Sequence, residues 1–248
     1  MKKKKIIITR RNAIITGMAT LSGLMLTGCS KKTPPTYGNI LRMGDALTYL
    51  AHRTLLPGQS LAKEYDHSAI SSFPATGTTD PGDPKGQYYS KAYKQFHNAA
   101  FADWSLKIEG SVSKPGSYSL SQLQAFPSRT QITRHTCEEG WTAIAEWTGV
   151  PLSHVLQQAG IKPGARYVNF HAYDGYIDSI DLMDAFHPQT ILAYGMNGQA
   201  LPVPHGAPLR VRVETQIGYK SIKYLEKIVV TDEFVDPGDS GWAWYTGI

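Results

Sequence analysis

Cysteine is almost absent from this chain, whose 248 residues contain two, Cys29 and Cys137. Cys29 follows Leu-Thr-Gly at 26–28, which resembles a lipobox, a processing signal in which the cysteine is acylated and becomes the new N-terminus. Cys137 is then the one free thiol, which excludes an intramolecular disulfide and a structural zinc site. If Cys137 carries chemistry, we expect a nucleophile or one ligand of a metal whose other ligands come from outside the protein.

Long hydrophobic runs are also lacking. The apolar stretch near the N-terminus is short and rich in Gly and Thr, which disfavours a transmembrane anchor. Residues 9–15 resemble a twin-arginine export signal in which Ala13 replaces the usual Phe or Leu. We therefore predict a cleaved signal peptide at 1–28, export to the periplasm and a membrane anchor through the acylated Cys29. Because twin-arginine export carries folded proteins, the signal also favours a cofactor that is loaded before export.

An excess of either charge is lacking once this signal is removed. Residues 1–28 hold six of the 25 Lys and Arg and no acids, so 19 bases remain against 20 acids, a formal charge of −1. The net charge of +5 of the full chain therefore indicates nothing about nucleic acid, and we expect no nucleic-acid partner.

Composition divides the remaining chain into three parts. Residues 29–39 are typical of a tether between a lipid anchor and a domain. Residues 40–94 begin with apolar residues at helical spacing, which predict a bracing helix, and continue into a long loop. That loop, at 72–91, is rich in Pro, Gly, Asp, Ser and Thr, and loops of this length often line a site. Residues 95–248 contain the main domain.

The main domain alternates short strand-like and helix-like segments. Period-two alternation and turn residues predict strands at 104–109, 129–136, 167–171, 191–194, 209–213 and 227–231. Helices are predicted at 121–126 and 151–160, the second because proline stands near its start and glycine at its end. Asn197-Gly198 between two apolar stretches predicts a hairpin turn. The pattern indicates an α+β fold with mixed sheets and flanking short helices.

The surroundings of Cys137 favour a metal ligand over a buried structural thiol. Its neighbours Arg134, His135, Glu138 and Glu139 are polar, which disfavours an apolar niche. No second cysteine, and no His or carboxylate set at metal-ligand spacing, accompanies it. A soft thiolate without protein co-ligands suits a metal whose other sulfur ligands come from a cofactor.

A second group of residues, downstream, suits a phosphate. Arg210 can donate two parallel hydrogen bonds to phosphate oxygens, and Lys220 and Lys223 add point charges. Gly218 lets the backbone approach an anion closely. A solvated strand edge would explain the same cations when they are taken alone.

These segments form an ordered series that resembles the molybdopterin-binding domain of the sulfite oxidase family over about residues 95–232. It is most similar to the single-domain bacterial methionine sulfoxide reductase catalytic subunits. The resemblance is carried by the sequences around Cys137-Glu138-Glu139-Gly140-Trp141, Trp147–Leu152, Asp174-Gly175-Tyr176, Ala193–Gly198, His205–Arg210 and Gly218–Lys223.

The resemblance implies a molybdenum–molybdopterin cofactor, with Cys137 as the catalytic residue and the protein's metal ligand. In the family, the residues that match His205, Arg210, Ser221 and Lys223 contact the cofactor. His97-Asn98 stands where an early Asn contact is expected, although closer to the cysteine than in the methionine sulfoxide reductases. With the nearby cation included, the predicted cofactor-binding residues are His97, Asn98, His205, Arg210, Lys220, Ser221 and Lys223.

Several departures from the family patterns bear on the substrate. Phe96-His97-Asn98 replaces the Arg-Asn-His of sulfite oxidases, and the chain has a short tail where they carry a dimerisation domain. Both differences count against sulfite. Ala172 replaces a Thr of the methionine sulfoxide reductases, so the pocket differs from theirs in detail. Asp174, Tyr176 and Trp141 are candidates to line it.

These features favour a periplasmic molybdenum oxidoreductase that performs two-electron oxygen-atom transfer, reducing an S-oxide or an N-oxide. The chain has no CxxCH haem site and no iron–sulfur cysteines, so we expect a haem partner, a membrane cytochrome b or a cytochrome c. The alternatives are a sulfite-oxidising enzyme, a non-catalytic binding lipoprotein, and a hydrolase or transferase. In the last, Cys137 would be the nucleophile and His135, His171 or His205 the base.

Overall fold

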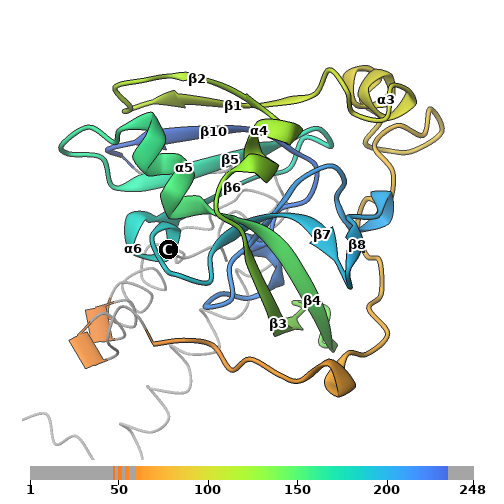
Figure 1. Cartoon of the computed structure of the whole chain (residues 1–248), viewed down its shortest axis with the longest axis horizontal. Helices are drawn as coiled ribbons and strands as arrows, with labels where there is room; N and C mark the ends of the chain where they lie inside the picture. The colour runs from red at the N-terminus through yellow and green to blue at the C-terminus, as the bar shows by residue number, and fades with distance from the viewer. Residues whose placement is uncertain (1–46, 48–49, 52–53, 56–59, 234–248) are drawn as a thin grey trace, which may run out of the picture. The chain divides into compact units, whose positions relative to one another are not determined.

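The computed structural model describes residues 60–233, together with Leu47, Leu50–Ala51 and Thr54–Leu55 (Figure 1). The chain divides into two compact units, and residues 60–233 lie in the larger one. The predicted signal peptide and the tether at 29–39 lie outside the described residues. So does most of the predicted bracing helix, although the five residues of it that the structure describes are helical.

The described domain is built from two five-stranded sheets with short helices around them (Figure 1). The strands are β1 (Ser105–Gly110), β2 (Gly116–Ser119), β3 (Arg129–Thr136), β4 (Thr142–Pro151), β5 (Tyr167–Ala172), β6 (Ile177–Asp181), β7 (Ile191–Met196), β8 (Gln199–Ala200), β9 (Arg210–Arg212) and β10 (Leu225–Thr231). The helices are α3 (Lys91–Asn98), α4 (Leu120–Ala125), α5 (Leu152–Ala159) and α6 (Leu182–Ala185), with 3-10 turns η1 (His67–Ala69), η2 (Val203–His205) and η3 (Gly218–Lys220).

The first sheet has the strand order β2-β1-β10-β5-β6, and only its β1–β10 pair is parallel. The second sheet has the order β3-β4-β7-β8, with β9 paired to β7. Because the chain crosses from one sheet to the other several times, residues far apart in sequence meet between them. One mixed sheet and one antiparallel sheet, with short helices around them, confirm the predicted α+β fold.

The main core is formed by the inward faces of both sheets and by α5. In β1, alternation buries Leu106 and Ile108 and leaves the intervening residues less buried. Their partners across the core include Val150 of β4 and Leu192 of β7. A smaller cluster around Trp147 packs on the other side of the second sheet, against Phe73 of the long loop. Of the residues in this second cluster and packed against it, Phe73 lines the site described below.

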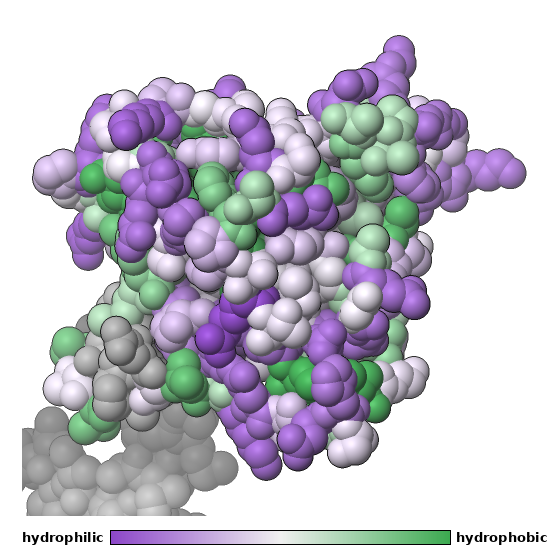
Figure 2. Space-filling model, viewed as in Figure 1, coloured by the Kyte–Doolittle hydropathy of each residue, from purple (hydrophilic) through white to green (hydrophobic). Residues whose placement is uncertain are grey.

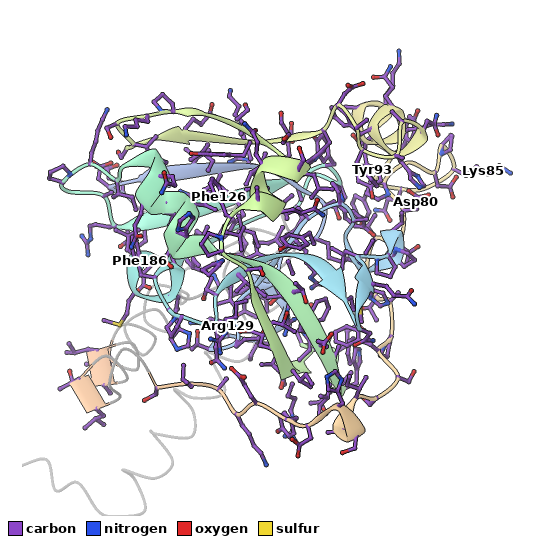
Figure 3. The ribbon with its side chains drawn as sticks, viewed as in Figure 1. Asp80, Lys85, Tyr93, Phe126, Arg129 and Phe186 are labelled. Carbon is purple, nitrogen blue, oxygen red and sulfur yellow. The ribbon has the colours of Figure 1, made fainter. Side chains whose placement is uncertain are left out.

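Local signals explain where the short helices begin and end. Ser119 and Gln122 form a reciprocal capping box at the start of α4, and Gly160 ends α5 in the left-handed conformation at φ 69°. Phe126 follows α4 and packs against His154 of α5, with ring centroids 4.8 Å apart (Figure 3). These contacts fix both helices on the sheets.

Helix α3 is joined to the rest of the domain by Tyr93, which is fully buried (Figure 3). Its hydroxyl donates to the carbonyl of Ala207 at 2.6 Å. None of the helices in the described part of the chain has the length and apolar content needed to span a bilayer. On the face shown in Figure 2, hydrophobic residues form separate groups among hydrophilic ones.

The predicted strands at 104–109, 129–136, 167–171, 191–194, 209–213 and 227–231 are confirmed within about two residues at either end, and so are the two predicted helices. Asn197 and Gly198 turn between β7 and β8 with φ of 51° and 73°, as the hairpin signal indicates. The sequence analysis missed β2, β4, β6, α3 and α6. Strand β4 was missed because it is buried on both faces and lacks a clear alternation.

Gly149 stands at an irregularity in the β4–β7 pairing, and a Cβ atom there would lie 2.2 Å from the carbonyl oxygen of Leu192. Gly149→Ala is therefore expected to lower the free energy of unfolding by about 1–3 kcal/mol, because two backbones must separate. The matched control is Gly116→Ala, whose Cβ meets nothing within 4 Å, with an expected change within about 1 kcal/mol. Urea denaturation measures both, and equal stabilities of the two variants would contradict the packing described here.

Candidate active site

The site is a cavity of about 740 Å³ to which five segments contribute. They are the long loop through 73–78 and Tyr88, the end of β3 with the turn after it at 135–141, the turn at 174–176, the segment at 204–210 and the loop at 218–223. The two sheets and the loop before α3 therefore all contribute side chains. The prediction that the long loop lines a site agrees with this arrangement.

Cys137 comes directly after β3, in a tight turn whose backbone is fixed at both ends. Its N–H donates to the carbonyl of Trp141 at 2.9 Å, and its carbonyl accepts from Gly140 at 3.1 Å. The side chain lines the cavity but is only 6% exposed. Its Sγ lies 3.6 Å from a carboxylate oxygen of Glu138. Burial raises the pKa of the thiol, and the charges of Glu138 and Glu139 raise it further.

Arg210, at the start of β9, brings a buried cation to the cavity lining. It donates through Nη1 to the carbonyl of His205 at 2.9 Å and through Nη2 to that of Ser221 at 2.8 Å. Its Nε is buried and has no hydrogen-bond partner among the described residues. Burial lowers the pKa of Arg210 to about 9, and the neighbouring Arg212 contributes to the shift. The guanidinium remains charged at neutral pH and donates to backbone carbonyls rather than to a carboxylate.

Lys223 and His205 line the same wall. The Lys223 ammonium donates to the carbonyls of Thr76 at 2.8 Å and Pro204 at 3.2 Å, and also to that of Thr78. Burial lowers the pKa of Lys223 to about 8, with Arg210 as the second cause. Burial, together with the same two cations, lowers the pKa of His205 to about 4, so its ring is neutral at pH 7. Lys223 thus ties the long loop to the cavity wall.

The structure brings Cys137, His205, Arg210, Ser221 and Lys223 together, and these residues all line the cavity. Their roles in binding remain predictions. One thiol, one buried guanidinium and one half-buried ammonium converge here, as a site for a metal-bearing anion requires.

Lys220, also predicted to bind the cofactor, lies outside the cavity lining. Its ammonium is 1% exposed, donates to Asp178 and to the carbonyl of Ser179, both at 2.8 Å, and is absent from the cavity lining. The Asp178 carboxylate also accepts from the hydroxyl of Tyr176, which does line the cavity, at 3.2 Å. The charge of Lys220 is therefore compensated internally, and its side chain stabilises the turn at 174–176 rather than facing the cavity.

His97 and Asn98 lie at the C-terminal end of α3 and do not line the cavity. The His97 ring stacks on Phe101, with centroids 5.6 Å apart and planes inclined by 18°. The structure therefore places these two predicted cofactor contacts away from the residues that line the cavity. His171 of β5 is also absent from the lining, so it does not pair with Cys137.

Phe73 of the long loop forms an aromatic wall that the sequence analysis did not identify. Its ring lies 5.2–5.6 Å from the rings of His135, Trp141, Trp147 and His205. Trp141 is a candidate that the structure confirms as lining, and so are Asp174 and Tyr176. This wall excludes water from one side of the cavity and strengthens the electrostatic interactions inside it.

Comparison with known proteins agrees with this geometry. Residues 93–237 match the family model described as the oxidoreductase molybdopterin binding domain, which is more than half of the chain. The chain belongs to this family. It is a molybdopterin-dependent oxidoreductase with the mixed-sheet fold of the sulfite-oxidase type.

Similar proteins extend over nearly the whole chain. A putative protein-methionine-sulfoxide reductase subunit, YedZ1, of Azospira oryzae is 34% identical over 98% of this chain and 90% of its own length. The protein-methionine-sulfoxide reductase catalytic subunits MsrP of Xanthomonas campestris pv. campestris and Xanthomonas axonopodis pv. citri are both 32% identical over 88% of this chain and 69% of theirs.

Among solved structures, the sulfane dehydrogenase SoxCD of Paracoccus pantotrophus matches with a TM-score of 0.52 and 26% identity. The match covers 54% of this chain and 39% of that one, so it extends to well under half of the solved chain. It supports the fold of the domain.

The cavity residues suit a molybdopterin cofactor. Among the described residues, Arg210 has a buried Nε–H without a hydrogen-bond partner and no carboxylate in contact with its guanidinium, which suits a phosphate group. Gly218 leaves room beside His135, because a Cβ there would lie 2.7 Å from the imidazole ring. No cluster of three His, Cys, Asp or Glu able to hold a metal occurs among residues 60–233. Cys137 would therefore be the protein's single metal ligand, with the remaining ligands supplied by the cofactor.

The main residue that sequence reasoning missed is Arg212. It follows Arg210 by two positions in β9, a spacing that places both side chains on one face of a strand. The sequence alone could therefore have indicated that Arg212 lies on the same face as Arg210. Glu214 accepts hydrogen bonds from Arg212 and from Gln131 of β3. Neither Glu214 nor Phe73 had a comparable signal, because the contacts of Glu214 with Gln131 and of Phe73 with the aromatic rings join segments far apart in the chain.

Arg210→Gln is expected to weaken cofactor retention about 10- to 100-fold, since a hydrogen bond to a charged group contributes about 1.5–3 kcal/mol. Molybdenum per chain after dialysis measures the effect. Arg166→Gln is the matched control, because Arg166 lies over the ring of Tyr167 outside the cavity lining. Molybdenum retention equal to wild type in Arg210→Gln, with an unchanged melting temperature, would show that Arg210 does not bind the cofactor.

Proposed function

We propose that this protein reduces an S-oxide or N-oxide substrate by two-electron oxygen-atom transfer. The observation that carries the proposal is the cavity itself, which is lined by both the Cys137 thiol and the buried Arg210, whose guanidinium donates to backbone carbonyls. The molybdenum cofactor, when bound, supplies the two-electron redox chemistry. The residues of the chain bind and position this cofactor.

Cys137 would hold the metal through its thiolate, while Arg210 and the loop at 218–223 hold the phosphate end of the cofactor. The thiol pKa is raised by burial and by Glu138 and Glu139, so the proton must leave when a metal binds. The tight turn from Cys137 to Trp141 fixes the position of the sulfur. Phe73 and Trp141 would keep water away from the reacting atoms.

The electrostatics of Cys137 count against the hydrolase or transferase alternative. A nucleophilic cysteine requires a lowered pKa, usually from a cation or a base in contact, whereas burial and two carboxylates raise the pKa of Cys137. His135 cannot serve as the base through Nδ1, because that nitrogen accepts a hydrogen bond from Arg212 at 2.7 Å. Its pKa is lowered to about 2 by burial, with Arg212 and Arg210 as further causes.

The direction of the reaction is proposed from the similar proteins. Two kinds of relative bear the name methionine sulfoxide reductase and match most of the chain. The solved relative is titled a sulfane dehydrogenase, which favours a sulfur-containing substrate but the opposite direction, and its match covers a smaller share of both chains. Glu138 and Glu139 beside the thiol also disfavour an anion such as sulfite.

Location and partner are part of the same proposal. An enzyme without haem or iron–sulfur ligands of its own needs an external electron donor, and a membrane cytochrome b or a cytochrome c fits this need. Export to the periplasm and an acylated Cys29 would hold the enzyme beside such a donor. The name of the Azospira oryzae relative describes it as a subunit, which agrees with an obligate partner.

The test is metal analysis combined with a substrate survey. Purified protein from a cofactor-competent strain is expected to contain about one molybdenum per chain, and Cys137→Ser is expected to lose it. Thr136→Ser is the control, since Thr136 is exposed on the other side of the strand end. Electrons from a reduced dye should reach S-oxides or N-oxides, and sulfite should not be oxidised. A metal-free protein whose Cys137 is readily alkylated with loss of activity would sink the proposal.

A further inference from the structure

His135 shares one side of its strand with the proposed metal ligand. It is the second-last residue of β3, and Cys137 follows two positions later, so strand alternation turns both side chains to the cavity. The imidazole is 7% exposed and is held between aromatic rings, with centroids 5.2 Å from Phe73 and 5.4 Å from Trp141. The ring therefore has little freedom to turn.

Arg212 decides which ring nitrogen of His135 carries the proton. Its Nη1 lies 2.7 Å from His135 Nδ1. A guanidinium can only donate hydrogen bonds, so Nδ1 must be the accepting, unprotonated nitrogen. A neutral imidazole with a bare Nδ1 carries its hydrogen on Nε2. The contact thus selects the Nε2–H tautomer.

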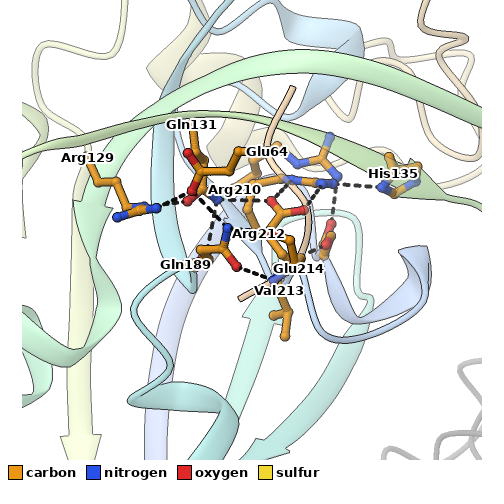
Figure 4. A network of polar contacts seen from close by, with 11 residues as sticks. Glu64, Arg129, Gln131, His135, Gln189, Arg210, Arg212, Val213 and Glu214 are labelled. Carbon is orange, nitrogen blue, oxygen red and sulfur yellow. Dashed lines mark hydrogen bonds and ion pairs between the residues drawn. The ribbon is translucent and has the colours of Figure 1, made fainter. Parts of the chain in front are cut away.

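Arg212 is itself held rigidly by a buried polar network (Figure 4). Glu214 accepts from its Nε at 3.1 Å and from its Nη2 at 2.9 Å, and both side chains are 1% exposed. Gln131 of β3 donates to Glu214 at 3.1 Å. The guanidinium also lies 4.5 Å from the ring centroid of Trp147. A planar group bound on two edges and one face cannot reorient to release Nδ1.

The other ring nitrogen is turned towards the loop at 218–223. A Cβ atom on Gly218 would lie 2.7 Å from both Nε2 and Cε1, so only glycine leaves space beside this edge of the ring. Within residues 60–233, Arg212 is the one hydrogen-bond partner found for the imidazole. An almost buried N–H that meets no protein acceptor is suited to an acceptor atom of a bound molecule.

We propose that His135 is a fixed, neutral hydrogen-bond donor to the oxygen atom of the S–O or N–O group of the substrate, and that Arg212 is the positioning residue that aims it. This inference rests on the proposed oxide reduction. The oxygen of a sulfoxide or N-oxide carries a large partial negative charge and no hydrogen, so it accepts hydrogen bonds and cannot donate them. A ring locked with Nε2–H beside Gly218, a residue of the cavity lining, is complementary to such an oxygen and not to a hydroxyl donor.

The tautomer can be observed directly, whatever the substrate. In cofactor-loaded protein with nitrogen-15-labelled histidine, the His135 signals, assigned by their loss in His135→Gln, are expected to show a protonated Nε2 and a bare Nδ1. The double variant Arg212→Met with Glu214→Leu, which removes both members of this buried ion pair together, is expected to give a mixture of tautomers. A wild-type ring protonated at Nδ1 would overturn the inference.

Kinetics then test the role in binding. His135→Leu is expected to raise KM for the oxide about tenfold without loss of molybdenum, because one hydrogen bond to substrate is gone. His135→Gln, whose amide reaches the Nε2 position, should stay within about threefold of wild type. His135→Asn, whose amide reaches only the Nδ1 position, should resemble His135→Leu and replaces it if that variant does not fold. His154→Leu, outside the cavity, is the control.

The outcomes separate this inference from the proposed function. Oxide reduction with an unchanged KM in both His135→Leu and His135→Asn would overturn the inference and leave the function intact. Loss of molybdenum in these variants would overturn it as well, because the ring would then hold the cofactor. If wild-type protein contains molybdenum but reduces no S-oxide or N-oxide, the proposed function fails, and with it the assignment of the acceptor oxygen.

Discussion

The site depends on two buried guanidinium groups beside Trp147. They differ in their partners, because one is paired with a carboxylate and the other donates to backbone carbonyls. Arg210 and Arg212 lie 5.0 and 4.5 Å from the Trp147 ring centroid. Arg212 is paired with Glu214, whereas Arg210 donates to backbone carbonyls. Removing a cation from water without a paired anion costs several kcal/mol. At the cavity wall the fold therefore retains a guanidinium charge that is not paired with a carboxylate of the described residues, and an anionic cofactor would neutralise it.

The long loop before α3 keeps the cations of the cavity wall in place and lowers the dielectric around them. Phe73 closes the aromatic wall, and the carbonyls of Thr76 and Thr78 accept from the Lys223 ammonium. The hydroxyl of Tyr224 donates to Thr78 at 2.9 Å as well. A loop held by side chains of the cavity itself lowers the local dielectric around the cations and keeps them in place. The loop is therefore part of the site.

Much of the fold and of the site could be predicted, because the relevant signals are local or belong to short motifs. Alternation located β1, and Gly160 marked the end of α5. The thiol and the phosphate-suited cations were found from residue type and order. The prediction was weaker where burial on both faces hides the period, as in β4, and where a cation has an internal partner, as Lys220 has in Asp178.

Residue type and order alone identify Cys137 as an isolated thiol among polar neighbours and assign its series of motifs to a molybdopterin-binding domain. Only the tertiary structure decided which cations face the cavity and which are compensated. Lys220 meets Asp178 across 42 positions, and Arg212 meets His135 across 77. Charge compensation and the choice of an imidazole tautomer depend on contacts of about 3 Å between such distant residues. No local pattern encodes these contacts, because they exist only after the sheets have come together.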